Sequence, residues 1–398
     1  MKRKGLLLCI FIILLIFVTG CWNRRELNDL AIAVGIAIDK SGNQYKVSAQ
    51  VVEPGEVSGK KGGSVAPVTL YQATGDTILE ALRQMTTISP RKIYLAHIRI
   101  LVLSESLARE GIRDSLDLMS REPETRNDYF IVVAKQATAE DMLKILTNLE
   151  KVPSIRLFST LETSAKQWAP TTTVNLDKLI SELVSEGRHP VLTGLNVIGD
   201  KKIGESKKNV ETVPSPADMQ YSGLAVFRKD KLIGWLSDEE GKAYNYIDNN
   251  IKSTVGHVNC PDGGKLSLKV IRSNTKVKGS LRDEHPRITI EVQSEANVGE
   301  VQCHLDLTKT ETIAEVEKLA DRKTEEFIEK TIKKVQQEYK IDIFGFGEVI
   351  RRSYPKAWKK LKKNWDQTFV NIPVNVKVTH KIPYLGKISN SFLEDMKE

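Results

Sequence analysis

Side chains able to do acid–base or nucleophilic chemistry occur in short groups along the chain. A catalytic site needs a nucleophile, a base and an orienting group to converge, or a recognisable motif around the nucleophile. The candidate groups lie in no nucleophile elbow, phosphate-binding loop or triad context. They are Ser104-Glu105, Glu239-Glu240 and Asp283-Glu284-His285. The sequence therefore predicts caps, turns and solvated faces at these places, and a protein that is not an enzyme.

The histidines and cysteines form no recognisable metal-binding motif. The six histidines stand far apart, and neither HExxH nor a Cys/His zinc pattern can be written from them. Of four cysteines, two lie near the start of the chain, which leaves Cys260 and Cys303. Because a protein with a large hydrophobic core does not need a disulfide crosslink for stability, two unpaired buried thiols are favoured over a disulfide. No metal and no cofactor are expected.

Cys21 is the cysteine with a clear chemical context. Three cationic residues precede thirteen apolar ones, Leu6–Val18, and Thr19-Gly20-Cys21 follows. A membrane-spanning helix needs about 20 apolar residues, so this shorter run is typical of an export signal. Its ending resembles the bacterial lipobox, in which the Cys thiol takes a diacylglycerol before cleavage on its N-terminal side. We expect residues 1–20 to be removed and Cys21 to be lipidated; a signal anchor with an incidental cysteine is the alternative.

The composition is that of a folded protein. The chain has 398 residues, of which 40% are hydrophobic and 28% charged, and this excludes disordered and collagen-like classes. Removal of the leader lowers the formal net charge from +8 to +5. That surplus modestly favours an anionic membrane and falls short of the basic stripe that nucleic-acid binding needs. No second apolar run of similar length follows, so we expect a soluble body held at the membrane by acyl chains.

The hydrophobic pattern of the first half predicts strands separated by helices, and hence a mixed sheet with packed helices. Residues 200–218 are polar and lysine-rich and predict an exposed loop. Asp76 is the expected cap of the first helix. The expected strands are 30–39, 44–52, 97–103, 129–135 and 190–199, and the expected helices are 77–85, 139–149, 154–168 and 176–185.

The second half is expected to be rich in sheet and then helical. Asp238 is expected to cap a helix at 239–247, and five short strands follow, at 253–259, 265–271, 275–281, 287–295 and 298–307. The segment Glu311 to Tyr339 has an apolar stripe at 3.6-residue spacing, which predicts a long helix packed on these strands. Its Glu/Lys-rich face is interpreted as solvated. A helix at about 354–365 and a strand near 370–382 complete the expectation.

Several segments resemble one family along nearly the whole chain and in the same order. They are the lipobox with the following WNRRELND, the strand end GIAID, HIRILVLSE at 97–105, TRNDYFIVVAK at 125–135, and the FGFGE, RRSYP and NW elements of 344–365. Together they resemble the Ger(x)C spore germination lipoproteins, the C subunits of nutrient germinant receptors. One departure is Asn23, where the family usually has Asp.

The resemblance implies an α/β fold of the α+β type with three consecutive domains, each a mixed or antiparallel sheet with packed helices. We divide the chain at 22–165, 166–284 and 285–398. It also implies a lipoprotein on the outer face of the spore inner membrane, whose partners are the A and B membrane subunits. Because the sequence shows no convergent polar constellation, we expect a scaffold or interaction subunit. A lipid-anchored extracytoplasmic solute-binding protein is the alternative, although the two similar lobes of that class are not evident.

Two pairs of arginines are candidate contact residues. Arg24 and Arg25 directly follow the anchor and can reach lipid phosphates at about 1 kcal/mol each; pairing within the first domain is the alternative. Arg351 and Arg352 lie in a segment, 344–365, that is rich in Trp, Phe and basic residues. In most proteins the aromatic residues of such a segment pack in the core and its charged residues face the solvent. Aromatic residues and Arg are, however, also common anchors of protein–protein interfaces.

The anchor assignment predicts that Cys21→Ala abolishes lipidation, because the substituted chain has no thiol to acylate. The variant should lose acyl labelling and leave the membrane fraction of spores. A variant that is still acylated and still fractionates with membranes would show that the anchor lies elsewhere.

Overall fold

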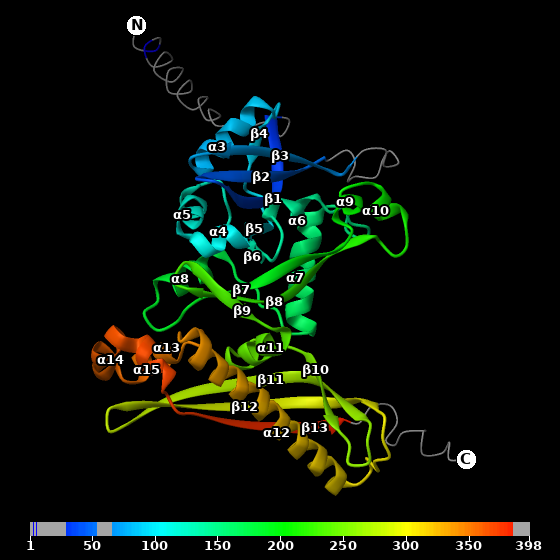
Figure 1. The fold of residues 1–398 in the computed structure, drawn as a ribbon, viewed down its shortest axis with the longest axis vertical. Coiled ribbons are helices and arrows are strands. Elements are labelled where there is room, and N and C mark those ends of the chain that lie inside the picture. The colour runs from blue at the N-terminus through cyan, green and yellow to red at the C-terminus, as the bar shows by residue number, and fades with distance from the viewer. Residues whose placement is uncertain (1–2, 4, 6–28, 54–65, 385–398) are drawn as a thin grey trace.

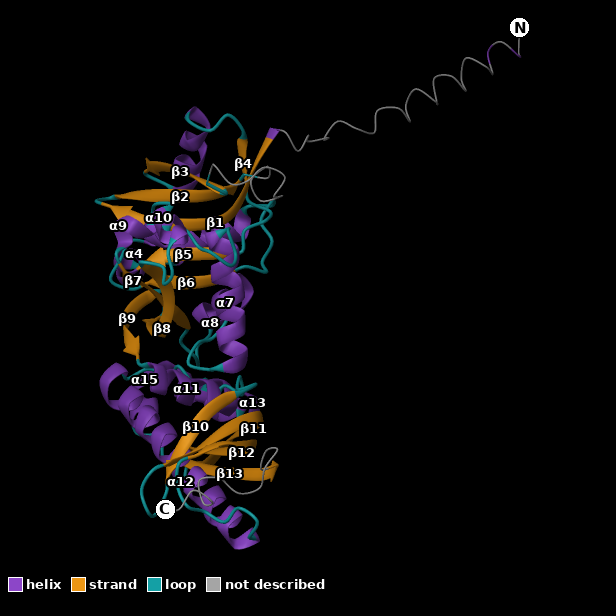
Figure 2. Ribbon diagram, turned by 90° about the vertical axis from the view of Figure 1, so that its right-hand side faces the viewer, coloured by secondary structure: helices purple, strands orange, loops and turns teal. Residues whose placement is uncertain are grey.

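The computed structural model describes residues 3, 5, 29–53 and 66–384, whose strands form two sheets with helices packed on them. The expected mixed α/β class is therefore confirmed. The two sheets follow one another along the long axis of the molecule, with a helix between them (Figures 1 and 2). Within the described residues, none of the helices combines the length and apolar character needed to span a bilayer.

The first sheet has nine strands, and its order is β3-β2-β1-β5-β6-β7-β8-β9, with β4 beside β1. The strands from β1 through β5 and β6 to β7 run parallel, while β2–β3 and β8–β9 add antiparallel edges. The bounds are β1 (Leu30–Ser41), β2 (Gln44–Val52), β3 (Val68–Gly75), β4 (Lys92–Tyr94), β5 (Ile100–Ser104), β6 (Phe130–Ala134), β7 (Val191–Gly199), β8 (Ala217–Arg228) and β9 (Lys231–Leu236).

Helices cover both faces of this sheet, which explains why β1 and β5 are almost continuously apolar. The bounds are α3 (Ile78–Gln84), η2 (Met85–Thr87), α4 (Glu105–Glu110), α5 (Arg113–Arg121), α6 (Ala139–Lys144), α7 (Pro153–Gln167), α8 (Leu176–Val184), α9 (Lys201–Gly204) and α10 (Lys208–Glu211). Residues of α3, α4, α5 and α8 pack on one face, and residues of α6 and α7 on the other.

Three local expectations are wrong. Thr77, not Asp76, caps α3, since its hydroxyl accepts the amide of Glu80 at 3.1 Å. Ser237, not Asp238, caps α11 (Asp238–Ile247) in a reciprocal arrangement with Glu240. Residues 200–218 are not simply an exposed loop, because they form α9 and α10 and begin β8; Asn209 is buried there and its amide bonds both backbone groups of Ala217.

The second sheet has the order β10-β11-β12-β13, with β13 parallel to β12 and the other pairs antiparallel. Its two long strands replace four of the short ones expected, because register shifts near Leu268 and Arg272 interrupt the alternation of side chains without ending the hydrogen-bonded ladder. The bounds are β10 (Thr254–Asn259), β11 (Lys265–Arg282), β12 (His285–Val301) and β13 (Val374–Tyr384).

The long helix α12 (Thr310–Lys334), continued by a π-helical turn η3 (Val335–Tyr339), packs on the second sheet as expected (Figure 1). Val316, Ala320 and Ile328 of the apolar stripe are buried against strands β10 to β13. Shorter helices follow, at α13 (Phe346–Ser353), α14 (Pro355–Leu361), η4 (Lys362–Asn364) and α15 (Trp365–Val370).

The charged face of α12 is not wholly solvated, which corrects the sequence interpretation. Three of its carboxylates accept backbone N–H groups from the open edge of β13. The pairs are Glu317 with Ile382 at 2.9 Å, Asp321 with His380 at 2.6 Å and Glu325 with Val378 at 2.9 Å. Four residues of helix rise about 6.0 Å and two residues of strand about 6.7 Å, so the two spacings match.

The division into 22–165, 166–284 and 285–398 stays a prediction, and the hydrogen-bonded sheets group the chain differently. Strands β6 and β7, on either side of residue 166, are neighbours in one sheet. Strands β11 and β12, on either side of residue 285, form one hairpin. Periodicity in a sequence identifies strands but does not report which strands pair, and so it does not locate the units they build.

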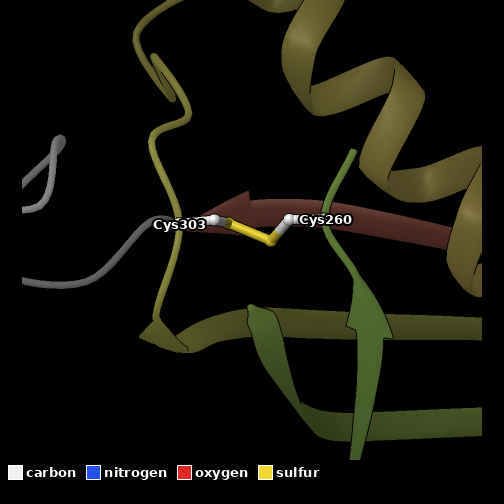
Figure 3. The surroundings of a disulfide bond; sticks show 2 residues. All are labelled: Cys260 and Cys303. Atoms are coloured by element: carbon white, nitrogen blue, oxygen red, sulfur yellow. A yellow bond between two sulfur atoms is a disulfide. The ribbon is translucent and has the colours of Figure 1, made fainter. Parts of the chain in front are cut away.

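Cys260 and Cys303 form a disulfide, so the expectation of two unpaired thiols is wrong. Cys260 follows β10 and Cys303 follows β12, and both strands pair with the same end of β11, where Leu266 faces both Val258 and Val301. The sheet therefore brings the two cysteines within 6.3 Å between Cα atoms (Figure 3). Their separation of 43 residues gave no local signal of this pairing.

Replacing both cysteines with Ala should lower the free energy of unfolding of the second sheet by about 2–4 kcal/mol, because the open loop regains conformational entropy in the unfolded chain. Chemical denaturation without reductant measures the change. Dithiothreitol should destabilise the unmodified protein by the same amount and leave the double variant unchanged. Two freely alkylated thiols in the native protein would contradict the disulfide.

Candidate partner-binding surface

The segment that carries Arg351 and Arg352 is organised by one buried carboxylate, that of Asp342. It accepts the amides of Phe344 and Gly345 on Oδ1, at 3.0 and 2.8 Å, and that of Gly347 on Oδ2 at 2.8 Å. The indole N–H of Trp365 donates to Oδ2 at 3.0 Å. Asp342 thereby shapes the turn that starts α13 and ties it to α15.

Burial raises the pKa of the Asp342 carboxyl, and the donors that surround it oppose that effect. Asp342 is fully shielded from solvent. A buried carboxylate whose hydrogen bonds are satisfied costs far less than an unpaired one. The FGFGE sequence is therefore explained by the backbone amides that it presents to Asp342.

We call the first sheet with its helices the first body, and the second sheet with α11 to α15 the second body. Two glycines let this turn touch the end of the first body. A Cβ on Gly347 would lie 2.6 Å from the Cα of Gly187, and one on Gly187 would lie 2.8 Å from backbone atoms of Gly347 and Glu348. The amide of His189 also donates to the Asp342 carbonyl at 2.7 Å, and the Ser185 hydroxyl donates to Glu348 at 2.7 Å. The backbone at Gly187 and the backbone at Gly347 thus cross in direct contact.

Arg188 strengthens the same junction. Its guanidinium is paired with Asp248 at 2.6 Å and with Glu182 at 3.1 Å, and it donates to the Tyr244 hydroxyl at 2.5 Å. Burial by itself would raise the pKa of Asp248, but the charge of Arg188 lowers it below its ordinary range. Glu182 comes from α8 and Asp248 follows α11, so this network links the first sheet's helices to the second body.

The aromatic residues of 344–365 serve packing. Trp358 and Trp365 are buried and meet edge to face, with ring centroids 5.0 Å apart. Phe344 and Phe346 are buried in the core of the second body and stack at 5.3 Å. These four rings are therefore not available as anchors for a partner, and only Tyr354 is left partly exposed.

The basic residues of the same segment are exposed and form a patch that we call the basic face. It comprises Arg351, Arg352, Lys356, Lys359, Lys360, Lys362 and Lys363. Arg351 is paired with Glu348, Lys360 with Glu284 and Lys362 with Glu186. The other four cations have no ion-pair partner among the described residues. Such a surface favours an acidic partner and raises the rate of its association.

Of the other candidate residues that the structure describes, Glu284 meets the basic face through its pair with Lys360. Cys21, Arg24 and Arg25 lie outside the described residues. Ser104 caps α4 and Glu105 pairs with Arg109, while Glu240 pairs with Lys334 and Glu284 with Lys360. These four side chains thus serve a helix cap and ion pairs, and the part of the chain that the structure describes holds no cluster of three or more His, Cys, Asp or Glu suited to a metal ion.

Comparison with known proteins shows two family models and several relatives that this chain resembles. A family model described as spore germination protein N-terminal domain matches residues 23–197, and one described as spore germination B3/GerAC like, C-terminal, matches residues 222–386. The chain is 34% identical to spore germination protein KC of Bacillus subtilis (strain 168) over the whole of both chains. It is 23% identical to spore germination protein B3 of the same organism, over 94% of this chain and 95% of that relative.

The fold is also shared with a solved structure. The crystal structure of the GerBC protein matches with a TM-score of 0.55 at 20% identity, over 91% of this chain and all of that one. The sequence resemblance described above is therefore confirmed along nearly the full length, and the arrangement of two sheets with packed helices is that of a known fold.

The junction predicts that Gly347→Ala destabilises the protein by about 1–3 kcal/mol, since the new methyl group would overlap the backbone of Gly187. Urea denaturation measures the change. The matched control is Gly256→Ala on β10, where a Cβ would meet nothing within 4 Å and stability should change by less than about 0.5 kcal/mol. Equal stability of the two variants would show that the crossing is looser than described.

Proposed function

Because this chain belongs to the family of spore germination B3/GerAC-like proteins, we propose that it is the C subunit of a nutrient germinant receptor. It works with the A and B membrane subunits as a scaffold or interaction subunit and catalyses no reaction. The observation that carries this proposal is the full-length similarity to spore germination protein KC. The exposed, partly unpaired basic face provides a surface for contacts of this kind.

The proposal includes a lipid anchor at Cys21 on the outer face of the spore inner membrane. The export signal and the lipobox-like ending support it. Two or three acyl chains provide a stable tether, whereas a single chain binds a membrane only reversibly. Arg24 and Arg25 would then lie at the lipid headgroups, next to the anchor.

The basic face is proposed to contact an acidic surface of a membrane subunit. Its cations lie on α13, α14 and η4, which Asp342 and the Gly187–Gly347 crossing hold in place on the rest of the chain. A rigid base matters for a binding surface because less conformational entropy is lost when the partner binds.

Reversal of charge at Arg351 and Arg352 should therefore impair assembly of the receptor. Arg351→Glu with Arg352→Glu is expected to reduce co-purification of the A and B subunits from spore membranes at least severalfold and to slow germination. Lys318→Glu with Arg322→Glu, an equal charge change on exposed residues of α12, is the matched control.

Circular dichroism establishes that both double variants remain folded. Lys356→Glu with Lys359→Glu, which breaks no ion pair among the described residues, repeats the test independently of the contact between Arg351 and Glu348. Normal assembly and germination of both basic-face variants would show that this face has only a structural role.

A further inference from the structure

A cavity of about 310 Å³ lies between α11, the strands β10 and β11, and α12. Trp168, at the end of α7, forms part of its wall, so the cavity lies where the first body meets the second. Figure 1 shows how these elements are arranged, with α11 above β10 and α12 crossing the sheet. Ligand sites are commonly found at such junctions between units, and this volume lies at the lower end of their usual range.

The interior of the cavity is apolar and partly aromatic. Val258, Leu268, Val270 and Ala320 line it from the sheet and from α12, and all four are buried. Tyr246 and Phe327 both line it and pack against each other, with ring centroids 5.8 Å apart at an angle of 60°. An aromatic ring of a ligand could pack against these two by the edge-to-face geometry that such pairs favour.

Two lysines from opposite helices lie at the rim. Lys242 of α11 donates to the carbonyl of Val255 at 3.1 Å, and its ammonium lies 3.7 Å from the ring centroid of Trp168. Lys323 of α12 donates to the carbonyl of His257 at 2.7 Å. Those carbonyls are two residues apart on one strand edge, hence about 7 Å apart, so the two ammonium groups lie along the same edge of β10.

The rim carries both signs of charge, since Lys242 and Lys323 lie there with the carboxylates of Asp238 and Glu239. Neither Lys242 nor Lys323 has an ion-pair partner among the described residues. Burial lowers the pKa of each of these lysines, and Lys265 adds to the effect at Lys323. Burial and the charges of Lys323, Lys265 and Lys242 likewise lower the pKa of His257. The charges of Asp238 and Glu239 oppose the effect of burial on the pKa of Lys242, and the Asp238 carboxylate also accepts the amide of Gly223 at 2.7 Å.

Each of the two lysine ammonium groups gives one of its N–H donors to a carbonyl at the open edge of β10. The remaining N–H donors of each ammonium take no part in that contact. A lysine ammonium has three N–H donors, and these two each give one to a strand carbonyl. Edge capping also does not require the apolar cavity beneath. The cavity and the free donors at its rim need a second explanation.

We propose that this cavity binds an aromatic carboxylate, with the carboxylate held between Lys242 and Lys323 and the ring packed against Tyr246 and Phe327. This site is distinct from the basic face and goes beyond the proposed scaffold function. A sugar has no apolar body to fill the interior.

The test is calorimetric titration of the full mature chain, purified in detergent, with 3-phenylpropionate. Its dissociation constant should be about 1 mM or lower, as expected for a ligand of this size. 3-Phenylpropan-1-ol, which has the same ring and no charge, should bind at least about tenfold more weakly. 3-Phenylpropylamine, which carries the opposite charge, should give no saturable heat.

Substitutions then assign the site. Lys242→Met and Lys323→Met, which keep an unbranched side chain and remove the charge, should each weaken binding of 3-phenylpropionate about tenfold. Lys269→Met is the matched control, because Lys269 lies on β11 between Leu268 and Val270 and alternation points it away from the cavity. Ala320→Met, which fills the interior without a charge change, should abolish binding.

Thermal unfolding establishes that each variant is folded, and the rim lysines are not core residues, so at least those two variants are expected to fold. Three results would each overturn the proposal: no saturable heat with 3-phenylpropionate up to 10-fold above the expected constant, equal affinity for the neutral alcohol, or an equal loss in Lys269→Met and the rim variants.

Discussion

The second body depends on satisfying the two open edges of a four-stranded sheet. An edge strand presents unpaired N–H and C=O groups, which invite pairing with other chains unless they are covered. Here α12 covers both edges with side chains: Glu317, Asp321 and Glu325 accept from β13, and Lys323 donates to β10, where Lys242 of α11 joins it. This requirement fixes the position of α12 on the sheet, and the cavity lies beside the lysines that cap β10.

The first and second bodies are joined by buried polar groups rather than by a flexible linker. Asp342 gathers the amides of the FGFGE turn, Arg188 pairs with carboxylates from α8 and from the residue after α11, and the backbone of Gly187 crosses that of Gly347. Breaking such a network leaves charged groups buried without partners, which is strongly unfavourable. Residues 344–365 are thus used to build this junction, and their exposed side carries the basic face.

The proposed role follows from the different placement of aromatic and basic side chains within one segment. The aromatic side chains of 344–365 are used for packing, and the cations are left on the surface. A subunit that acts by contact needs a surface whose geometry is maintained when the partner is absent, and the junction provides it. The cavity at Trp168 lies at another boundary between the same two bodies, so a ligand there would touch residues of both.

The sequence by itself determined the family, the mixed α/β class and the major helices and strands, because these depend on local order and periodicity, while the export signal and the lipid anchor stay predictions. It did not determine the Cys260–Cys303 disulfide, the two-sheet grouping or the use of α12 carboxylates on β13. Each of these joins residues that are distant in sequence and brought together by strand pairing. The basic face was predicted in part: Arg351 and Arg352 are exposed, but burial of Trp358 and Trp365 was decided by the tertiary structure. An apolar residue has the same sequence signal in a core and in an interface, and only packing distinguishes them.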